Sequence, residues 1–191
     1  MSRSSTKQPA SRYATSDDFR EVFTTSLDEF YKLAFLLTGD SEKAEQAFVA
    51  GIEDSVKSNH VFKEWAHSWA KRVIIKNAIR LMQPHATDHE ASSAASAVSE
   101  KDKLRIIRDG HLEIDSVLAL EDFERFVFVM TVLERYSDHD AALLIGCSMD
   151  EIRAARVSAL EEIAVLASTD SSWDFPLGRG PHHLPLENTP R

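Results

Sequence analysis

The chain has little of several things that would point to other protein classes. Its 191 residues include one cysteine, Cys147, which excludes an internal disulfide framework and is typical of a reducing compartment. Glycine and proline are scarce, at six residues each, and segments free of both favour helix. No apolar run approaches the roughly 18 residues of a membrane span, and the N-terminus has no apolar signal core. We therefore expect a soluble, helical, cytoplasmic protein that is not associated with a membrane.

Motifs for catalysis are also missing. We find no arrangement of a nucleophile with a histidine and an acid, no glycine-rich phosphate loop and no acidic metal cluster. Two histidine pairs, His85 with His89 and His182 with His183, lack supporting acid or thiol ligands. We therefore expect a protein that is not an enzyme and that has no cofactor, metal or small-molecule substrate.

Basic residues are few, and their distribution is uneven. The net charge is −9, and the segment from Glu113 to Ser168 alone holds twelve acidic residues against four arginines, or −8. An acidic surface favours a basic protein partner over bare nucleic acid. In contrast, the segment from Val61 to Met82 carries five cations and one acid when Lys63 and Glu64 are included.

Composition divides the chain into five segments. Residues 1–15 are polar and 169–191 hold glycine and four prolines, so both are expected to be disordered tails. Residues 16–83 show three helical patterns, and 113–168 form a second all-helical domain. Between them, 84–112 contain an alanine- and serine-rich run typical of a flexible linker. The fold class predicted is all-α, with two small helical domains.

Residues with clear capping preferences set the expected helix ends. A first helix begins near Ser16 and ends at Gly39, and the Thr24-Thr25 pair is expected to bend or break it. A second helix follows Ser41, and a third covers about 61–82. In the second domain we expect helices at about 114–119, 121–135, 137–145 and 148–167.

A tight turn separates the last two of these helices. Gly146 can adopt a left-handed conformation at low steric cost, and Ser148 can cap the helix that follows, with Asp150 and Glu151 in its first turn. This pattern is typical of a helix-turn-helix, whose second helix can enter a major groove. Arg153 and Arg156 on that helix are then candidates for DNA contact, whereas a solvent-exposed bundle helix is the simpler alternative.

The third helix has a second candidate surface. Lys71, Arg72, Lys76 and Arg80 recur at helical spacing, so we expect them on one exposed face, where they could bind phosphates. Trp65 and Trp69 lie one turn apart, and we interpret them as core residues. The alternative is that exposed aromatic rings stack on unpaired bases.

Several short motifs together resemble a known family. The run Leu37-Thr38-Gly39-Asp40, followed by Ala44-Glu45, looks like a helix ending in "LTGD", and Trp69-Ala70 with Lys76-Asn77 looks like a later "WL…N" stretch. Residues 118–160 are similar to a second conserved region, with matches at Arg125, Phe128, Ala142, Gly146, Ser148, Ile152, Arg153 and Leu160. The chain resembles the bacterial RNA polymerase sigma factors of the sigma-70 family, in their short extracytoplasmic-function form. That form keeps only regions 2 and 4.

The resemblance implies a function and a set of sites. A sigma factor of this kind binds core RNA polymerase and directs it to promoter DNA; an anti-sigma factor is a further partner that the resemblance allows. Region 2 would bind the polymerase clamp through Glu45, Gln46 and Val49 and the −10 element through the basic third helix. Region 4 would bind the −35 element and the polymerase flap, with DNA contacts from Ser148, Arg153 and Arg156.

Two alternatives stay open. The first is a degenerate sigma-like protein that binds another protein without direct promoter recognition, which the acidic second domain favours. The second is a plain helical interaction module. In the second helix of the turn motif, two positions that are usually basic in the family hold Ala155 and Ser158.

Overall fold

The computed structural model describes residues 12–58, 60–86 and 114–170, and these are helical throughout apart from turns and one isolated β-bridge between Tyr13 and Phe62. The all-α prediction is confirmed for this part of the chain. Apart from residues 84–86, the expected linker lies outside the described residues, as do most of the two expected tails. The division into domains therefore stays a prediction.

The first group of helices runs up to the expected linker. It comprises α1 (Ser16–Thr25), α2 (Leu27–Thr38), α3 (Ser41–Lys57), the short 3₁₀ helix η1 (Lys63–Trp65) and α4 (Ala66–Met82). The expected break after the Thr24-Thr25 pair is confirmed, since α1 and α2 are separate helices joined at Ser26. Gly39 ends α2 in the left-handed conformation, with φ of 66°.

Thr15 and Asp18 form a reciprocal cap at the start of α1. The Asp18 amide donates to Thr15 Oγ1 at 3.3 Å, and the Thr15 amide donates to Asp18 Oδ2 at 2.7 Å. The hydroxyl and amide of Thr15, with Lys63 Nζ at 2.9 Å, lower the pKa of Asp18 to about 2. Residues 12–15, which we expected to belong to a disordered tail, thus have a structural role at the start of this helix.

The second group of helices matches the expected boundaries closely. It comprises α6 (Ile114–Ala119), α7 (Asp122–Phe128), a π-helical turn η2 (Val129–Leu133), α8 (Asp138–Ile145) and α9 (Met149–Asp170). The expected helix over 121–135 instead changes to π-helical bonding at Val129, where the Glu134 amide donates to the Val129 carbonyl at 2.9 Å. Arg135, with φ of 58°, ends this segment.

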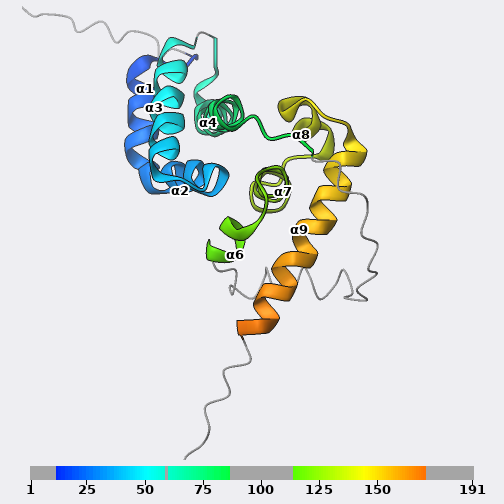
Figure 1. Cartoon of the computed structure of the whole chain (residues 1–191). Coiled ribbons are helices and arrows are strands. Elements are labelled where there is room, and N and C mark those ends of the chain that lie inside the picture. The colour runs from blue at the N-terminus through cyan, green and yellow to red at the C-terminus, as the bar shows by residue number, and fades with distance from the viewer. Residues whose placement is uncertain (1–11, 59, 87–113, 171–191) are drawn as a thin grey trace, which may run out of the picture.

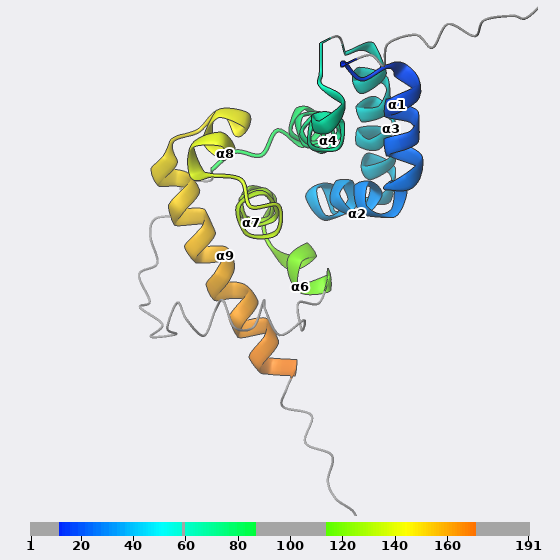
Figure 2. The same ribbon diagram turned by 180° about the vertical axis from the view of Figure 1, so that it is seen from behind.

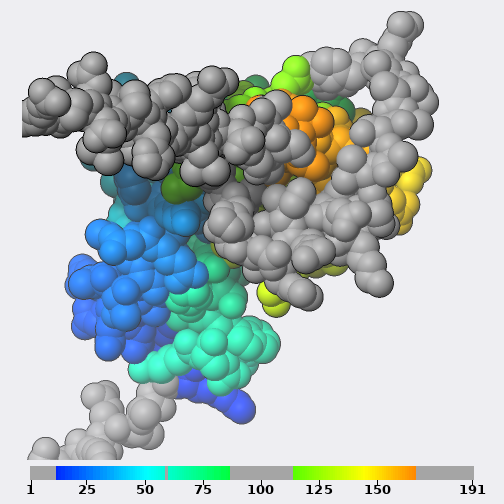
Figure 3. All heavy atoms as spheres, turned by 90° about the horizontal axis from the view of Figure 1, so that it is seen from below, coloured from blue at the N-terminus to red at the C-terminus, as the bar shows by residue number. Residues whose placement is uncertain are grey.

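The two groups share one hydrophobic core. Figures 1 and 2 show α7 between the α2–α4 side of the first group and α9. Buried side chains of α2 belong to the same continuous cluster as those of α7 and α9, including Leu36, Leu37, Phe126, Phe128 and Ile152. In the space-filling view of Figure 3, the blue to green atoms of α1–α4 lie on one side and the yellow and orange atoms of α8 and α9 on the other.

Arg125 of α7 fixes this contact with hydrogen bonds to both groups. Its buried guanidinium donates to the Leu37 carbonyl at 3.3 Å, to the Leu120 carbonyl at 2.9 Å and to Asp122 Oδ1 at 2.5 Å. The guanidinium lies against Gly39, where an added Cβ would be 3.3 Å from Arg125 Nη2. The end of α2 thus provides both an acceptor and the space for an arginine of the other group.

Candidate nucleic-acid interface

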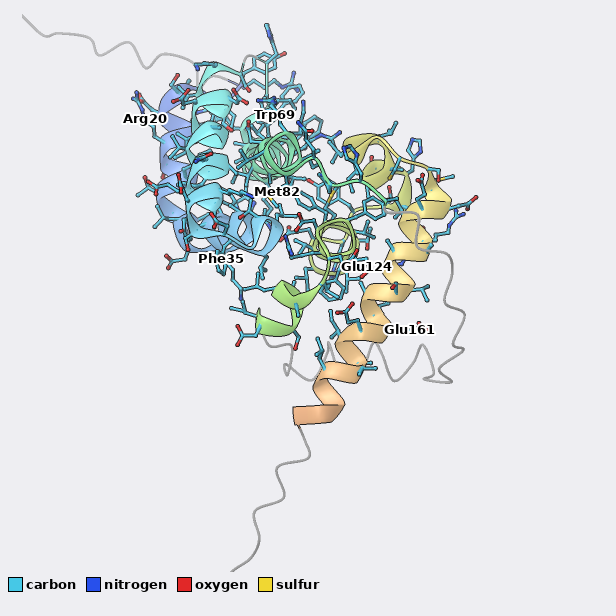
Figure 4. All side chains as sticks on the ribbon, viewed as in Figure 1. Arg20, Phe35, Trp69, Met82, Glu124 and Glu161 are labelled. Atoms are coloured by element: carbon cyan, nitrogen blue, oxygen red, sulfur yellow. The ribbon has the colours of Figure 1, made fainter. Side chains whose placement is uncertain are left out.

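The expectation that Trp65 and Trp69 are core residues is wrong. Their side chains are 59% and 37% exposed, and Trp69 lies on the side of α4 away from α7 (Figure 4). The buried stripe of α4 is formed instead by smaller residues, among them Ala66, Ala70 and Ile74. Ala66 and Ala70 lie on the inward side of the helix, so Trp65 and Trp69, each one residue earlier, point outward.

Trp65 forms a ring cluster with Tyr13 and Phe62, and Trp69 follows Trp65 one turn further along the chain; these four residues are here called the aromatic patch. The rings of Tyr13 and Phe62 stack with centroids 5.0 Å apart, and Phe62 meets Trp65 edge-on at 5.1 Å. The indole N–H of Trp69 donates to Ser58 Oγ at 3.0 Å. Sequence reasoning missed Tyr13 and Phe62, because the pairing that joins residues 12–14 to the segment before η1 has no local signal.

Three of the four expected cations of α4 are accessible. Lys76 and Arg80 are exposed, Arg72 is partly exposed, and no described carboxylate forms an ion pair with Arg72 or Lys76. Arg80 Nη1 donates to Asn77 Oδ1 at 3.0 Å, and buried Asn77 in turn donates to Asp54 Oδ2 at 3.1 Å. Asn77 therefore anchors the guanidinium of Arg80 to α3.

Lys71 is not exposed as we expected. Its side chain is only 20% exposed, and its ammonium lies 2.7 Å from Glu29 Oε1 of α2 and 2.7 Å from Glu134 Oε2 just after η2. Burial acts to lower the pKa of Lys71, but the bonds to Glu134 and Glu29 outweigh it and raise that pKa. The bond from Lys71 likewise lowers the pKa of Glu29. Lys71 thus joins the two helix groups.

The predicted polymerase-binding residues lie together on the outer side of α3. Glu45, Gln46 and Val49 are all exposed, and Gln46 Nε2 donates to Glu42 Oε1 at a long 3.4 Å. The opposite side of α3 packs Ala44, Ala47 and Phe48 into the core. This arrangement leaves the three side chains accessible to a partner.

The turn between α8 and α9 has the expected geometry. Gly146 has φ of 89°, and its amide donates to the Ala142 carbonyl at 2.8 Å. Ser148 and Glu151 form a reciprocal cap, in which the Glu151 amide donates to Ser148 Oγ at 3.2 Å and the Ser148 amide donates to Glu151 Oε2 at 2.7 Å. The two bonds to Ser148 lower the pKa of Glu151.

Both arginines predicted to contact DNA pair with acids of the same domain. Arg153 Nη1 lies 2.8 Å from Asp150 Oδ1, and Arg153 Nε lies 3.4 Å from Asp138 Oδ2. Arg156, one third exposed, forms a close ion pair with Asp138 at the start of α8. These carboxylates reduce the positive charge that the two guanidinium groups offer to a phosphate.

Other kinds of site find no support in the described ranges. Within them, no three His, Cys, Asp or Glu residues gather as metal ligands would, and no helix combines the length and apolarity needed to cross a bilayer. Comparison with models of known protein families and with curated proteins finds no match for this chain. What the chain does must therefore be inferred from its own residues.

Proposed function

We propose that this chain is a sigma-type transcription initiation factor, a non-enzymatic, cytoplasmic protein that binds core RNA polymerase and promoter DNA. In this proposal residues 16–83 and 113–168 act as region 2 and region 4, and the latter is a helix-turn-helix. The aromatic patch would hold bases of the unpaired strand while the cations of α4 hold its phosphates. The family resemblance of the sequence is one support, and the surface chemistry of α4 is the other.

The single observation that carries the proposal is the exposure of Trp65 and Trp69 beside the accessible cations of α4. Exposed tryptophans are unfavourable in water, and base stacking on an aromatic ring contributes about 1–3 kcal/mol per base. Arg72, Lys76 and Arg80 follow the tryptophans along α4 and supply positive charge for the strand backbone. A plain helical module has no need for this combination.

Two further surfaces support the same function. The exposed side of α3 offers Glu45, Gln46 and Val49 to the polymerase, and the capped turn at Gly146 and Ser148 has the form of a helix-turn-helix. The acidic second domain would contact duplex DNA weakly by itself. Held in the polymerase complex, it would gain contact through its high effective concentration.

The test measures how the full chain binds single-stranded DNA and how it opens a promoter with core polymerase. Trp65→Ala with Trp69→Ala should weaken binding of a fluorescent single-stranded oligonucleotide about tenfold or more, from the lost stacking. Tyr31→Ala is the matched control, because Tyr31 is an exposed aromatic residue of α2 outside the aromatic patch. Anisotropy measures the binding, and run-off transcription with core polymerase on genomic fragments measures the opening.

Two outcomes would contradict the proposal. Equal strand affinity in the double variant and the Tyr31→Ala control would show that the aromatic patch does not hold bases. Failure of the wild-type chain to bind core polymerase in a pull-down, while strand binding persists, would favour a nucleic-acid-binding protein that is not a sigma factor.

A further inference from the structure

An exposed cation lies over the Phe62 end of the aromatic patch. The guanidinium carbon of Arg12 is 5.6 Å from the centroid of the Phe62 ring, and Arg12 is exposed. The Lys63 amide donates to the Arg12 carbonyl at 3.3 Å, and the Ala14 amide donates to the Val61 carbonyl at 2.7 Å. Backbone bonds thus hold Arg12 beside the patch, and its side chain stays accessible.

Cations therefore flank the aromatic patch at both ends. An edge-on ring contact joins Phe62 to Trp65, and Trp69 follows Trp65 one turn later. Beyond Trp69, the accessible cations of α4 continue the row at helical spacing. Arg12 lies at the opposite end of the row, over Phe62. The rings thus lie between the positive charge of α4 and that of Arg12.

Arg12 is the described cation at this end of the patch whose charge is available to a ligand. Lys63 Nζ lies 2.9 Å from Asp18 Oδ1, so the charge of Lys63 is already matched. No described carboxylate forms an ion pair with Arg12, and residues 1–11 contain no acidic residue. Glu64 of η1 is exposed and adds one negative charge nearby in the chain. An anion at this end is therefore drawn to Arg12 itself.

A single strand that stacks its bases on the rings would meet both groups of cations. Phosphates precede and follow every base inside a strand, so the backbone continues on both sides of a stacked base. A guanidinium can keep one face over an aromatic ring while the N–H groups at its edge donate to a phosphate. Arg12 can therefore bind a phosphate without leaving Phe62.

We propose that Arg12 is a second phosphate-binding residue of the strand site, placed across the aromatic patch from the cations of α4. The ligand is accordingly an internal stretch of single-stranded DNA, whose backbone is held on both sides of the stacked bases. This inference rests on the proposed function and extends it, because that function assigns the phosphates to α4 alone.

The experiment measures the salt dependence of strand binding by the full chain. The probe is a fluorescein-labelled oligo(dT) of about 16 nucleotides, long enough to pass beyond the patch on both sides. Arg12→Gln should lower the slope of log affinity against log salt by about 0.7, because one phosphate contact is lost. The same loss should weaken binding about fourfold at about 0.15 M salt.

Arg20→Gln is the matched control. It removes the same charge from an exposed arginine of α1 that pairs with Asp17 and points away from α4 (Figure 4). This control should leave the slope and the affinity nearly unchanged. Arg12→Lys keeps the charge and should restore most of the wild-type slope.

Three results would overturn the proposal. Equal slopes for Arg12→Gln and Arg20→Gln would show that Arg12 binds no phosphate. A weaker affinity of Arg12→Gln with an unchanged slope would show that Arg12 acts only through its packing on Phe62. A slope of Arg12→Lys as low as that of Arg12→Gln would show that the charge at this position is not what binds. If circular dichroism shows Arg12→Gln unfolded, Arg12→Met and Arg20→Met replace the pair, with the same expected difference.

A circular oligo(dT) tests whether the ligand is an internal stretch of strand. It has no free end, so it should bind the wild type about as tightly as the linear probe and show the same loss of slope in Arg12→Gln. Binding about tenfold weaker than that of the linear probe would show that the site needs a strand end and would overturn the proposal.

The same assay separates this inference from the proposed function. If Trp65→Ala with Trp69→Ala weakens binding while the two arginine variants have equal slopes, the role of Arg12 alone is overturned. If the tryptophan double variant binds as tightly as Tyr31→Ala, or if the wild type does not bind oligo(dT), the proposed strand site is contradicted and the role of Arg12 with it.

Discussion

At the residue scale, Lys71 and Lys76 show how one helix gives similar side chains different roles. Lys71 bridges Glu29 and Glu134 between the two groups, whereas Lys76 extends into solvent with no described partner. From helical spacing alone, we predicted that both lysines lie on one exposed basic face. The difference arises from α2 and from Glu134 after η2, which lie on the side of α4 where Lys71 is and which the local sequence of α4 does not reveal.

Lys71→Ala should therefore act on stability. Its loss leaves the partly buried Glu134 facing the exposed Glu29 without a cation between them, and we expect the free energy of unfolding to fall by about 1 kcal/mol. Lys76→Ala should change that free energy by less than about 0.5 kcal/mol but weaken binding of a single strand. Urea denaturation and oligonucleotide anisotropy measure the two effects. Equal destabilisation by both substitutions would show that the bridge contributes no stability.

The same bridge should make stability depend on pH. The pKa of Glu29 is lowered from its ordinary 4.5, so its contribution is present above pH 4.5 and is lost as the pH falls below that value. The pKa of Lys71 is raised from 10.5, so its contribution is present below pH 10.5 and is lost as the pH rises above it. The stability difference between the wild type and Lys71→Met should therefore be largest between these limits and shrink below pH 4.5. A difference that stays constant through acid pH would contradict this.

At the scale of the element, helix ends were the part of the fold that the sequence predicted best. Gly39 and Gly146 end α2 and α8 as expected, because a left-handed terminal residue favours glycine. Two details could not be predicted. Ser16 and Thr15 are both good caps, and the choice of Thr15 depends on its bonds with Asp18; the π-helical turn after α7 depends on the packing around Val129.

The cap of α1 gives a prediction for that helix. Thr15→Ala removes the hydroxyl that bonds Asp18, and we expect a loss of about 1 kcal/mol in the free energy of unfolding. The pKa of Asp18 should rise from about 2 toward its ordinary 3.8, which an NMR titration of the carboxyl group would follow. Thr15→Ser, which keeps the hydroxyl, is the control and should preserve both quantities. An unchanged Asp18 titration in Thr15→Ala would show that the amide of residue 15 and Lys63 hold the pKa low without the hydroxyl.

At the scale of the whole molecule, the shared core has a mechanical consequence. Leu36 and Leu37 of α2 belong to the same buried cluster as Phe126 of α7, so the two groups should lose their structure together. Sequence patterns predicted the two groups of helices, because each has its own periodicity. They could not predict the contact between the groups, because it depends on Arg125, Gly39 and the Leu37 carbonyl meeting across a long separation in the chain.

Cooperative unfolding can be tested with Trp65 of η1 and Trp69 of α4. In a Trp173→Phe background, fluorescence comes only from Trp65 and Trp69 in the first group. Phe126→Ala in the second group removes a fully buried ring and should cost about 3–5 kcal/mol. The fluorescence midpoint in urea should then shift to lower concentration together with the circular dichroism signal. A fluorescence midpoint unaffected by Phe126→Ala would show that 16–83 and 113–168 fold separately.

The contact between the Arg125 guanidinium and Gly39 also has a genetic consequence. A side chain at position 39 would have to adopt a left-handed backbone, and its Cβ would also press closely on the Arg125 guanidinium. In a library that varies all positions, alanine at 39 should be recovered mainly with a shorter residue at 125. Suppressors of Gly39→Ala would then map to α7 in the second group, and two positions that no local pattern links would be inherited as a pair.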